Sequence, residues 1–259
     1  MRRVRDSVVF ETPPKRRRLT CRYFEKCAGF LETLGLPSES LNPSYDRCYC
    51  DVCAPRSHLP EVMQVAGERY ELPLGFAGFG MQTPPRAASL CIFDRWHVSY
   101  HGLRASVLGS VIQEGGLLLP GDTLLDGSTI EAIHTRGGEQ RKQLYTSPSV
   151  RYAEHEIYTA PQLCSGHVVR VVLQCRQQPG YNVCAETIGW EHENPGTPIS
   201  KYFDNTIIER FTRSRAAIIP YRILVKMEPP VFEIDWSGRT LGKTVATSMQ
   251  FTKCAKTDF

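Results

Sequence analysis

The spacing of apolar positions along the chain predicts two helices. Apolar residues recur at helical spacing between residues 20 and 36, where Thr20 suits an N-cap and Gly35 and Pro37 end the pattern. A second helical pattern covers residues 105–115. We expect each helix to bury one apolar side against the rest of the protein.

Alternating apolar and polar positions predict the strands. The clearest strand covers residues 166–176, and others are expected at 96–101, 206–211 and 216–227. The segment 59–95 is rich in proline and glycine, which indicates a connecting segment that packs on the following domain. Three further expectations are a strand running into a turn at 117–122, a loop or hairpin at 123–142, and a loop or short hairpin at 189–206.

A short strand ending at Tyr145 is followed at once by a predicted helix. Ser147 suits the N-cap of that helix, with Pro148 in its first turn. The helix would then carry Ser149 and Tyr152 on one face. Two tyrosines and a serine at such a turn can form a slot for a flat ring that bears an amide. The alternative is a capped helix with tyrosines in the core.

Two other stretches carry candidate chemistry. His101-Gly102 closes a predicted strand, and the glycine would let a ligand approach the backbone. The alternative is a core histidine beside a turn glycine. Glu209 stands among apolar residues of a predicted strand, so it is either a functional carboxylate or a residue that faces solvent.

Length and charge limit the class of protein. A chain of 259 residues can hold one large domain, or one domain and a small module. The net charge is +4, and much of the positive charge lies in the first eighteen residues. We expect a disordered tail there, with Lys15 to Arg18 as either a nuclear localisation or acidic-partner contact or a solvated run. No run of eighteen apolar residues and no secretory signal is present, so we expect an intracellular protein, cytoplasmic or nuclear, without a membrane partner.

Five of the ten cysteines lie before residue 54. Cys48, Cys50 and Cys53 have the spacing that lets thiolates converge on one tetrahedral zinc ion. His58 completes the candidate ligand set, and Cys21 or Cys27 are alternatives for the fourth position. The zinc would be structural, and a reduced cysteine-rich loop without metal is the other interpretation.

The three candidate blocks occur in an order that resembles the ADP-ribosyltransferases of the histidine-tyrosine-glutamate class. His101-Gly102, then Tyr145, then Glu209 match that class over about residues 90–228. The closest similarity within it is to the C-terminal region of neuralized-like proteins, in which the cysteine cluster has a counterpart. No neuralized repeat is visible, so ligase-scaffold functions are not carried over.

The resemblance implies an α+β fold. It would be a split β-sandwich of mostly antiparallel sheets with flanking helices, preceded by a small cysteine-rich helical module. The expected organisation is a basic tail, a cysteine-rich module, a linker that packs on the domain, the ADP-ribosyltransferase-like domain and a C-terminal extension, at residues 1–19, 20–60, 61–89, 90–230 and 231–259.

The resemblance also implies NAD as the substrate. Glu209 would stabilise positive charge that develops on the ribose, and His101 would bond a ribose hydroxyl on the adenosine side. Tyr145 and Tyr152 would sandwich the nicotinamide ring, while Gly102 and Ser149 would bond its carboxamide. Leu103 departs from the family, since many members have serine or threonine there.

The expected function is therefore mono-ADP-ribosyl transfer from NAD to a protein acceptor, with a nucleic-acid acceptor left open. Two alternatives belong to other classes. One is an inactive module of the same fold that binds NAD or a protein partner, and the other is a zinc-stabilised interaction scaffold.

Overall fold

The computed structural model describes residues 21–131, 135–136, 139–140, 142–230, 233–234 and 240–241. The expected tail at 1–19, and the expected C-terminal extension apart from two short strands, lie outside the described residues. Within the described part, no helix is both long and apolar enough to cross a membrane.

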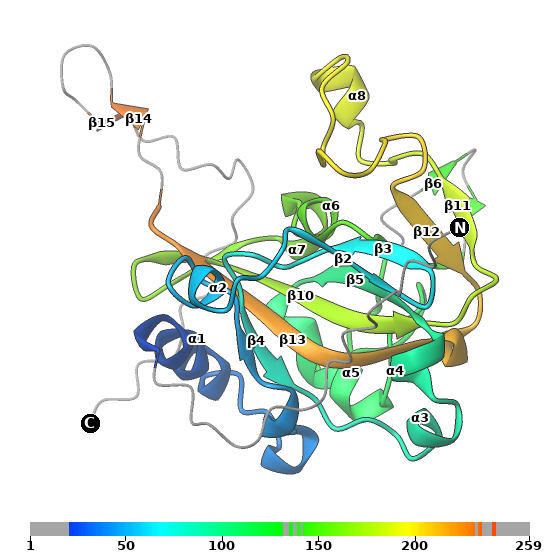
Figure 1. The fold of residues 1–259 in the computed structure, drawn as a ribbon, viewed down its shortest axis with the longest axis horizontal. Coiled ribbons are helices and arrows are strands. Elements are labelled where there is room, and N and C mark those ends of the chain that lie inside the picture. The colour runs from blue at the N-terminus through cyan, green and yellow to red at the C-terminus, as the bar shows by residue number, and fades with distance from the viewer. Residues whose placement is uncertain are drawn as a thin grey trace, which may run out of the picture.

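A large antiparallel sheet forms the centre of the molecule (Figure 1), with strand order β1-β4-β13-β10-β5 and β9 paired to β10. Its strands are β1 Arg47–Cys48, β4 Ala77–Gly80, β5 His97–Leu103, β9 Gln162–Cys164, β10 His167–Gln177 and β13 Ile218–Glu228. The long pair β10–β13 runs in register from Val168 opposite Glu228, with one irregularity between Gln174 and Cys175. This pair forms the middle of the central sheet. It confirms the strands predicted at 166–176 and 216–227.

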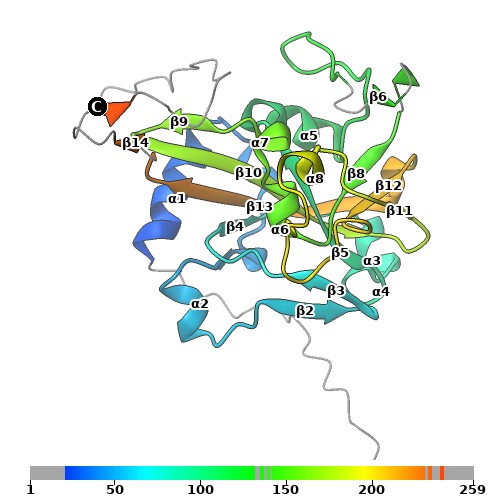
Figure 2. The same ribbon diagram turned by 90° about the horizontal axis from the view of Figure 1, so that it is seen from above.

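A second sheet has the order β11-β12-β8 and is also antiparallel. Its strands are β8 Leu144–Thr146, β11 Asn182–Cys184 and β12 Glu209–Thr212. Directly after β8, the backbone joins the central sheet at a bridge in which Ser147 and Tyr100 of β5 exchange both backbone hydrogen bonds. Figure 2 shows β8, β11 and β12 together at the β5 side of the central sheet.

Three two-stranded hairpins complete the described strands. They are β2 Val62–Val65 with β3 Glu68–Glu71, β6 Thr135–Arg136 with β7 Glu139–Gln140, and β14 Glu233–Ile234 with β15 Thr240–Leu241. Every strand pair in the described residues is antiparallel, as expected for a mixed α and β fold of this kind.

Helices cover both faces of the central sheet (Figure 1). They are α1 Arg22–Glu32, α2 Cys53–Arg56, α3 Arg86–Ser89, α4 Ile92–Arg95, α5 Leu108–Glu114, α6 Val150–Ala153, α7 Glu156–Thr159 and α8 Trp190–Glu193. Short 3-10 turns lie at Ser38–Ser40, Pro43–Tyr45, Ala105–Val107 and Arg215–Ala217. The apolar sides of α1 and α5 pack into one core with Leu173 and Ile223, and α6 packs on the other face with Val172 and Leu224. Because both faces of the sheet are covered, β10 is buried continuously from Val171 to Gln177, its polar residues included.

The segment expected to be a linker at 61–89 contributes to the central sheet instead, because β4 lies between β1 and β13. The expected module at 20–60 likewise supplies β1 and α1 to the same sheet and core. The sequence pattern did not predict β4, because all four of its residues are buried and apolar and polar positions therefore do not alternate. A Cβ atom on Gly80 would lie 2.0 Å from the carbonyl oxygen of Asn42, so glycine is required where the chain packs this closely.

Other boundaries also differ from expectation. The N-cap of α1 is Cys21 rather than Thr20, and residues 117–122 form no strand. The segment 189–206, expected to be a loop or short hairpin, is a loop that also contains the short helix α8. Strand β12 begins only at Glu209, because Thr206 is held in a turn by the side chain of Asp204.

Candidate functional site

A cavity of about 350 Å³ opens beside β5, next to the bridge that joins the two sheets. Its walls include five of the six residues that the sequence nominated for NAD: His101, Gly102, Tyr145, Tyr152 and Glu209. They come from three separate parts of the chain. Ser149, the sixth, does not line the cavity.

His101 is held by the second sheet. Its Nδ1 atom lies 2.8 Å from the carbonyl oxygen of Tyr145. Burial lowers the pKa of His101, which outweighs the opposite effect of that hydrogen bond, so the ring is neutral near pH 7. A carbonyl oxygen only accepts, so Nδ1 carries the proton and Nε2 keeps a lone pair for a hydroxyl donor.

Gly102 contacts α6 and α7 on its side-chain face, and it also lines the cavity. On its side-chain face, a Cβ atom would lie 2.0 Å from the carbonyl oxygen of Ala153 and 2.8 Å from Cβ of Tyr158. The glycine therefore lets α6 and α7 pack directly on β5. Along the strand, the N–H and C=O of Tyr100 point to β8, so those of Gly102, two residues later, point the same way, away from β10. This direction is the cavity side of β5, where the two sheets separate.

Tyr145 forms part of the opposite wall from β8. Its hydroxyl donates to Oε1 of Gln143 at 2.9 Å, and its ring lies 5.9 Å from the ring of Phe211. The ring is half-buried, so one part of it is fixed by neighbours while another part meets the cavity. Such a ring offers a flat apolar surface for stacking.

Ser149 caps a helix instead of facing the cavity. It is the N-cap of α6, in place of Ser147, and accepts from the backbone N–H of Tyr152. Its hydroxyl donates to Oε2 of Glu71 at 2.5 Å. The expected pair of Ser149 and Tyr152 on one helical face is therefore replaced by a cap that joins α6 to β3.

Glu209 lies at the start of β12 and is only 1% exposed. Its Oε1 atom accepts from the hydroxyls of Tyr158 at 3.0 Å and Tyr152 at 3.2 Å. Its Oε2 atom accepts from the hydroxyl of Thr187 at 2.8 Å and from the thiol of Cys184 at 3.6 Å. Burial raises the pKa of Glu209, although these four donors act in the opposite direction.

Tyr152 and Tyr158 have different positions around this carboxylate. Tyr152 is 2% exposed, whereas Tyr158 is half-buried, and both line the cavity. Their hydroxyls are 3.0 Å apart and their rings are nearly edge to face. Tyr158 was missed from the sequence, although it stands only six residues after Tyr152, in the next short helix, α7. Thr187 and Cys184 gave no local signal, since only the β11–β12 pairing brings them to Glu209.

The rest of the cavity wall is mainly apolar. It is formed by side chains of β5, α5 and the segments that follow α5, including Leu103, Val107, Val111, Leu118 and Ile130. Leu103 is 5% exposed and belongs to the main core. The leucine in this position therefore closes the core beneath the cavity and offers no hydroxyl to a ligand.

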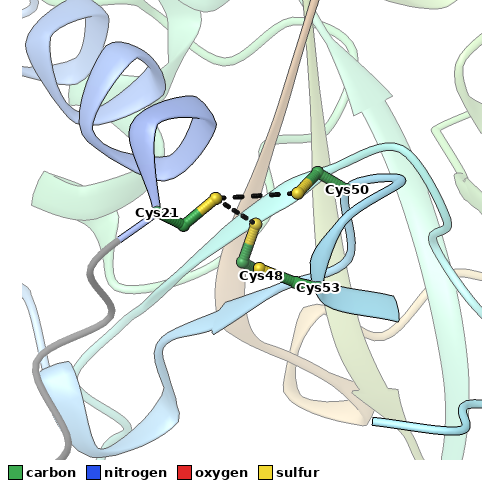
Figure 3. Close-up of side chains that lie close together, drawn as sticks. All are labelled: Cys21, Cys48, Cys50 and Cys53. Atoms are coloured by element: carbon green, nitrogen blue, oxygen red, sulfur yellow. Dashed lines mark hydrogen bonds between the residues drawn. The ribbon is translucent and has the colours of Figure 1, made fainter. Parts of the chain in front are cut away.

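Four cysteine thiols meet near the start of α1 (Figure 3), from Cys21, Cys48, Cys50 and Cys53. All four sulfur atoms lie within 4.8 Å of one another, and Cys21 Sγ is 3.6 Å from Cys50 Sγ and 3.8 Å from Cys48 Sγ. Four thiolates at about 2.3 Å around a tetrahedral zinc ion would be roughly 3.8 Å apart. The cluster therefore fits one such metal ion.

The fourth residue of this group is Cys21 and not His58. His58 is exposed and is absent from the group. Cys27, the other alternative, lies in the main core with its sulfur 3.9 Å from the carbonyl oxygen of Val225, and burial raises its pKa to about 12. Burial also acts to raise the pKa of Cys21, but hydrogen bonds from Phe24 N–H and from neighbouring thiols lower it to about 7. Burial raises the pKa of Cys48 and Cys53 instead, so the metal assignment rests on the spacing of the four sulfur atoms.

Compared with known protein families, the chain matches no family model.

Proposed function

We propose that this protein binds NAD in the cavity beside β5 and transfers its ADP-ribosyl group to an acceptor. One observation carries the proposal: the ring of His101, the backbone of Gly102 and the carboxylate of Glu209 converge on one cavity from distant parts of the chain. These are the three groups that the resemblance assigns to the adenosine-side ribose, the nicotinamide amide and the reacting ribose.

The nicotinamide would bind between Gly102 and Tyr145. A carboxamide has one acceptor and two donor hydrogens, which match the N–H and C=O groups that Gly102 directs to this side of β5. The half-buried ring of Tyr145 would stack on the pyridine ring. Tyr158 replaces Ser149 in this proposal as the additional contact, because it lines the cavity and Ser149 does not.

Transfer requires the bond between C1′ of the ribose and the nicotinamide nitrogen to break. The nicotinamide leaves with the bonding electron pair, and the acceptor supplies a new pair to C1′ and loses a proton. Positive charge develops on the ribose, so a fixed carboxylate at this point stabilises the transition state more than the bound substrate. Glu209 would have this role.

The proposed acceptor is a protein that receives a single ADP-ribosyl group. A first experiment incubates the purified chain with labelled NAD and cell lysate, and then treats the product with protease or nuclease. Label that survives nuclease but not protease supports a protein acceptor, and the reverse pattern supports a nucleic acid.

Glu209→Gln tests the chemistry, since it keeps the shape and removes the charge. We expect NAD affinity measured by calorimetry to stay nearly unchanged, while transfer falls by on the order of a hundredfold or more. Glu156→Gln, an exposed glutamate on the neighbouring helix α7, is the matched control and should transfer normally. If Glu209→Gln transfers as fast as the parent, the carboxylate has no part in the reaction.

A non-catalytic NAD-binding module is the second candidate, and the burial of Glu209 favours it. The carboxylate is 1% exposed and already accepts from four donors. A parent protein that binds NAD but releases no nicotinamide, with or without lysate, would establish this candidate in place of the first.

We also infer that the four-cysteine group holds a structural zinc ion. The sulfur spacing fits tetrahedral zinc, and all four ligand positions are filled by protein, which leaves no open position for catalysis.

A further inference from the structure

We propose that Thr187 is a positioning residue that holds the Glu209 carboxylate in the orientation needed for transfer. The inference rests on the proposed function and names the residue that would make Glu209 effective. It comes from the contacts around the carboxylate, where two tyrosine hydroxyls donate to Oε1, and the Thr187 hydroxyl donates to Oε2 at a shorter distance than the thiol of Cys184.

Thr187 contacts the carboxylate assembly twice. Its hydroxyl donates to Oε2 of Glu209 at 2.8 Å, and its backbone N–H donates to the hydroxyl of Tyr152 at 3.0 Å. Tyr152 in turn donates to Oε1 of Glu209 at 3.2 Å. One residue therefore fixes both oxygens of the carboxylate, one directly and one through Tyr152.

The turn that carries Thr187 is itself firmly held. The carboxylate of the preceding residue, Glu186, accepts from the backbone N–H groups of the four residues after Thr187, at 2.9 to 3.2 Å. The backbone N–H of Glu186 donates to the carbonyl oxygen of Asn205, and Cys184 is paired opposite Glu209. The hydroxyl of Thr187 consequently has a defined position relative to β12.

Thr187 acts through Glu209 and not on NAD. It is not among the residues that line the cavity, whereas Tyr158, on the Oε1 side, is. The two oxygens thus have separate partners: Oε2 accepts from Thr187 and Cys184, and Oε1 accepts from Tyr152 and Tyr158, both of which line the cavity. A carboxylate held by one oxygen keeps the other directed at the reacting ribose.

The test compares Thr187→Val, which removes only the hydroxyl, with Thr187→Ser, which restores it. Thr197→Val is the control, because Thr197 is an exposed threonine of the same loop. We expect Thr187→Val to lower kcat roughly ten- to a hundredfold, as for one lost hydrogen bond to a charged group, with NAD affinity changed less than about threefold. Thr187→Ser should recover most of the rate, and Thr197→Val should match the parent.

The pH profile gives a second readout. The hydrogen bond from Thr187 lowers the pKa of Glu209, so its loss should move the acidic limb of the kcat profile of Thr187→Val to higher pH. Equal kcat values and superimposed profiles for parent and Thr187→Val would overturn the proposal.

Failure of the proposed function would be recognised separately. If the parent releases no nicotinamide from NAD, the pKa of Glu209 is measured directly by carboxyl ¹³C NMR in the parent and in Thr187→Val. An upward shift in the variant still supports Thr187 as the anchor of this carboxylate, and an unchanged pKa overturns it whatever the chemistry of the cavity.

Discussion

At Gly102, the protein itself occupies the space that a side chain would need. The carbonyl oxygen of Ala153 would lie 2.0 Å from an added Cβ atom, and this oxygen belongs to backbone at the end of α6, which cannot rotate away. The glycine thus has a packing role that is independent of any ligand, in addition to its place on the cavity wall.

Gly102→Ala should therefore separate β5 from α6 and α7 and destabilise the protein by about 1–3 kcal/mol or more, the usual cost of overpacking. Thermal unfolding measures this effect. Gly29→Ala is the control: it lies in the middle of α1 with no atom within 4 Å of the added Cβ, and it should be neutral or stabilising. Equal unfolding temperatures for parent and Gly102→Ala would show that the contact relaxes freely.

Glu209 should affect the pH dependence of stability. Burial raises its pKa in the folded state, so the folded protein binds more protons than the unfolded chain between the ordinary glutamate pKa of about 4.3 and the raised value. The unfolding free energy of the parent should then decrease, relative to Glu209→Gln, as pH rises through this window. Denaturant unfolding at several pH values measures the unfolding free energy of the parent minus that of Glu209→Gln. A value that stays constant or increases as pH rises would contradict the assignment.

Among the elements, the start of α1 is tied to β1 and α2 by the cysteine group. Cys21 is the N-cap of α1, while Cys48 ends β1 and Cys53 begins α2. A metal ion would join three elements that are short or lie at the sheet edge. This link would add to the core contacts of α1, which already packs Cys27, Phe30 and Leu31 against the central sheet.

Elemental analysis of the protein should give one zinc per chain, and Cys21→Ser should lose it. His58→Ala should keep the zinc, because His58 lies outside the sulfur group. Cys91→Ser, a half-buried cysteine elsewhere, serves as the control for loss of a thiol. Zinc that is lost from His58→Ala and retained by Cys21→Ser would reverse the ligand assignment.

In the whole molecule, two antiparallel sheets meet at the bridge between Tyr100 and Ser147 and separate beyond it. The cavity opens in this region, with one wall on each sheet. A ligand that contacts both His101 and Tyr145 would join the two sheets and bind only the folded state. Ligand binding should therefore be visible as global stabilisation.

NAD at a hundred times its Kd should stabilise the protein by about 2.7 kcal/mol, measured as a rise in Tm. The deamidated analogue, which carries a carboxylate in place of the carboxamide, should stabilise it less, because the carbonyl of Gly102 would face an acceptor rather than a donor. Tyr145→Ala should reduce the shift with NAD by removing the stacking surface. An equal shift with both ligands would place the nicotinamide away from Gly102.

The amino-acid sequence by itself determined where the longer helices and strands lie, each of which buries one or both of its faces. The strands β5, β10 and β13 and the helices α1 and α5 have local periodicities, because each residue's burial follows from its position in its own element. The cysteine spacing likewise indicated a candidate metal site, since three cysteines lie within six residues. The order of the histidine, tyrosine and glutamate blocks also comes from sequence alone.

Only the tertiary structure decided which side chains meet. Ser149 bonds Glu71, which is 78 residues away, and Cys21 rather than His58 joins the cysteine group. Strand β4 could not be predicted from the sequence pattern, because its glycines allow close packing of the backbone but add no apolar–polar alternation. Thr187 and Tyr158 reach Glu209 only after β11, β12 and α7 have packed. Periodicity encodes which face of an element is buried, but the partner on that face depends on how distant elements pack together.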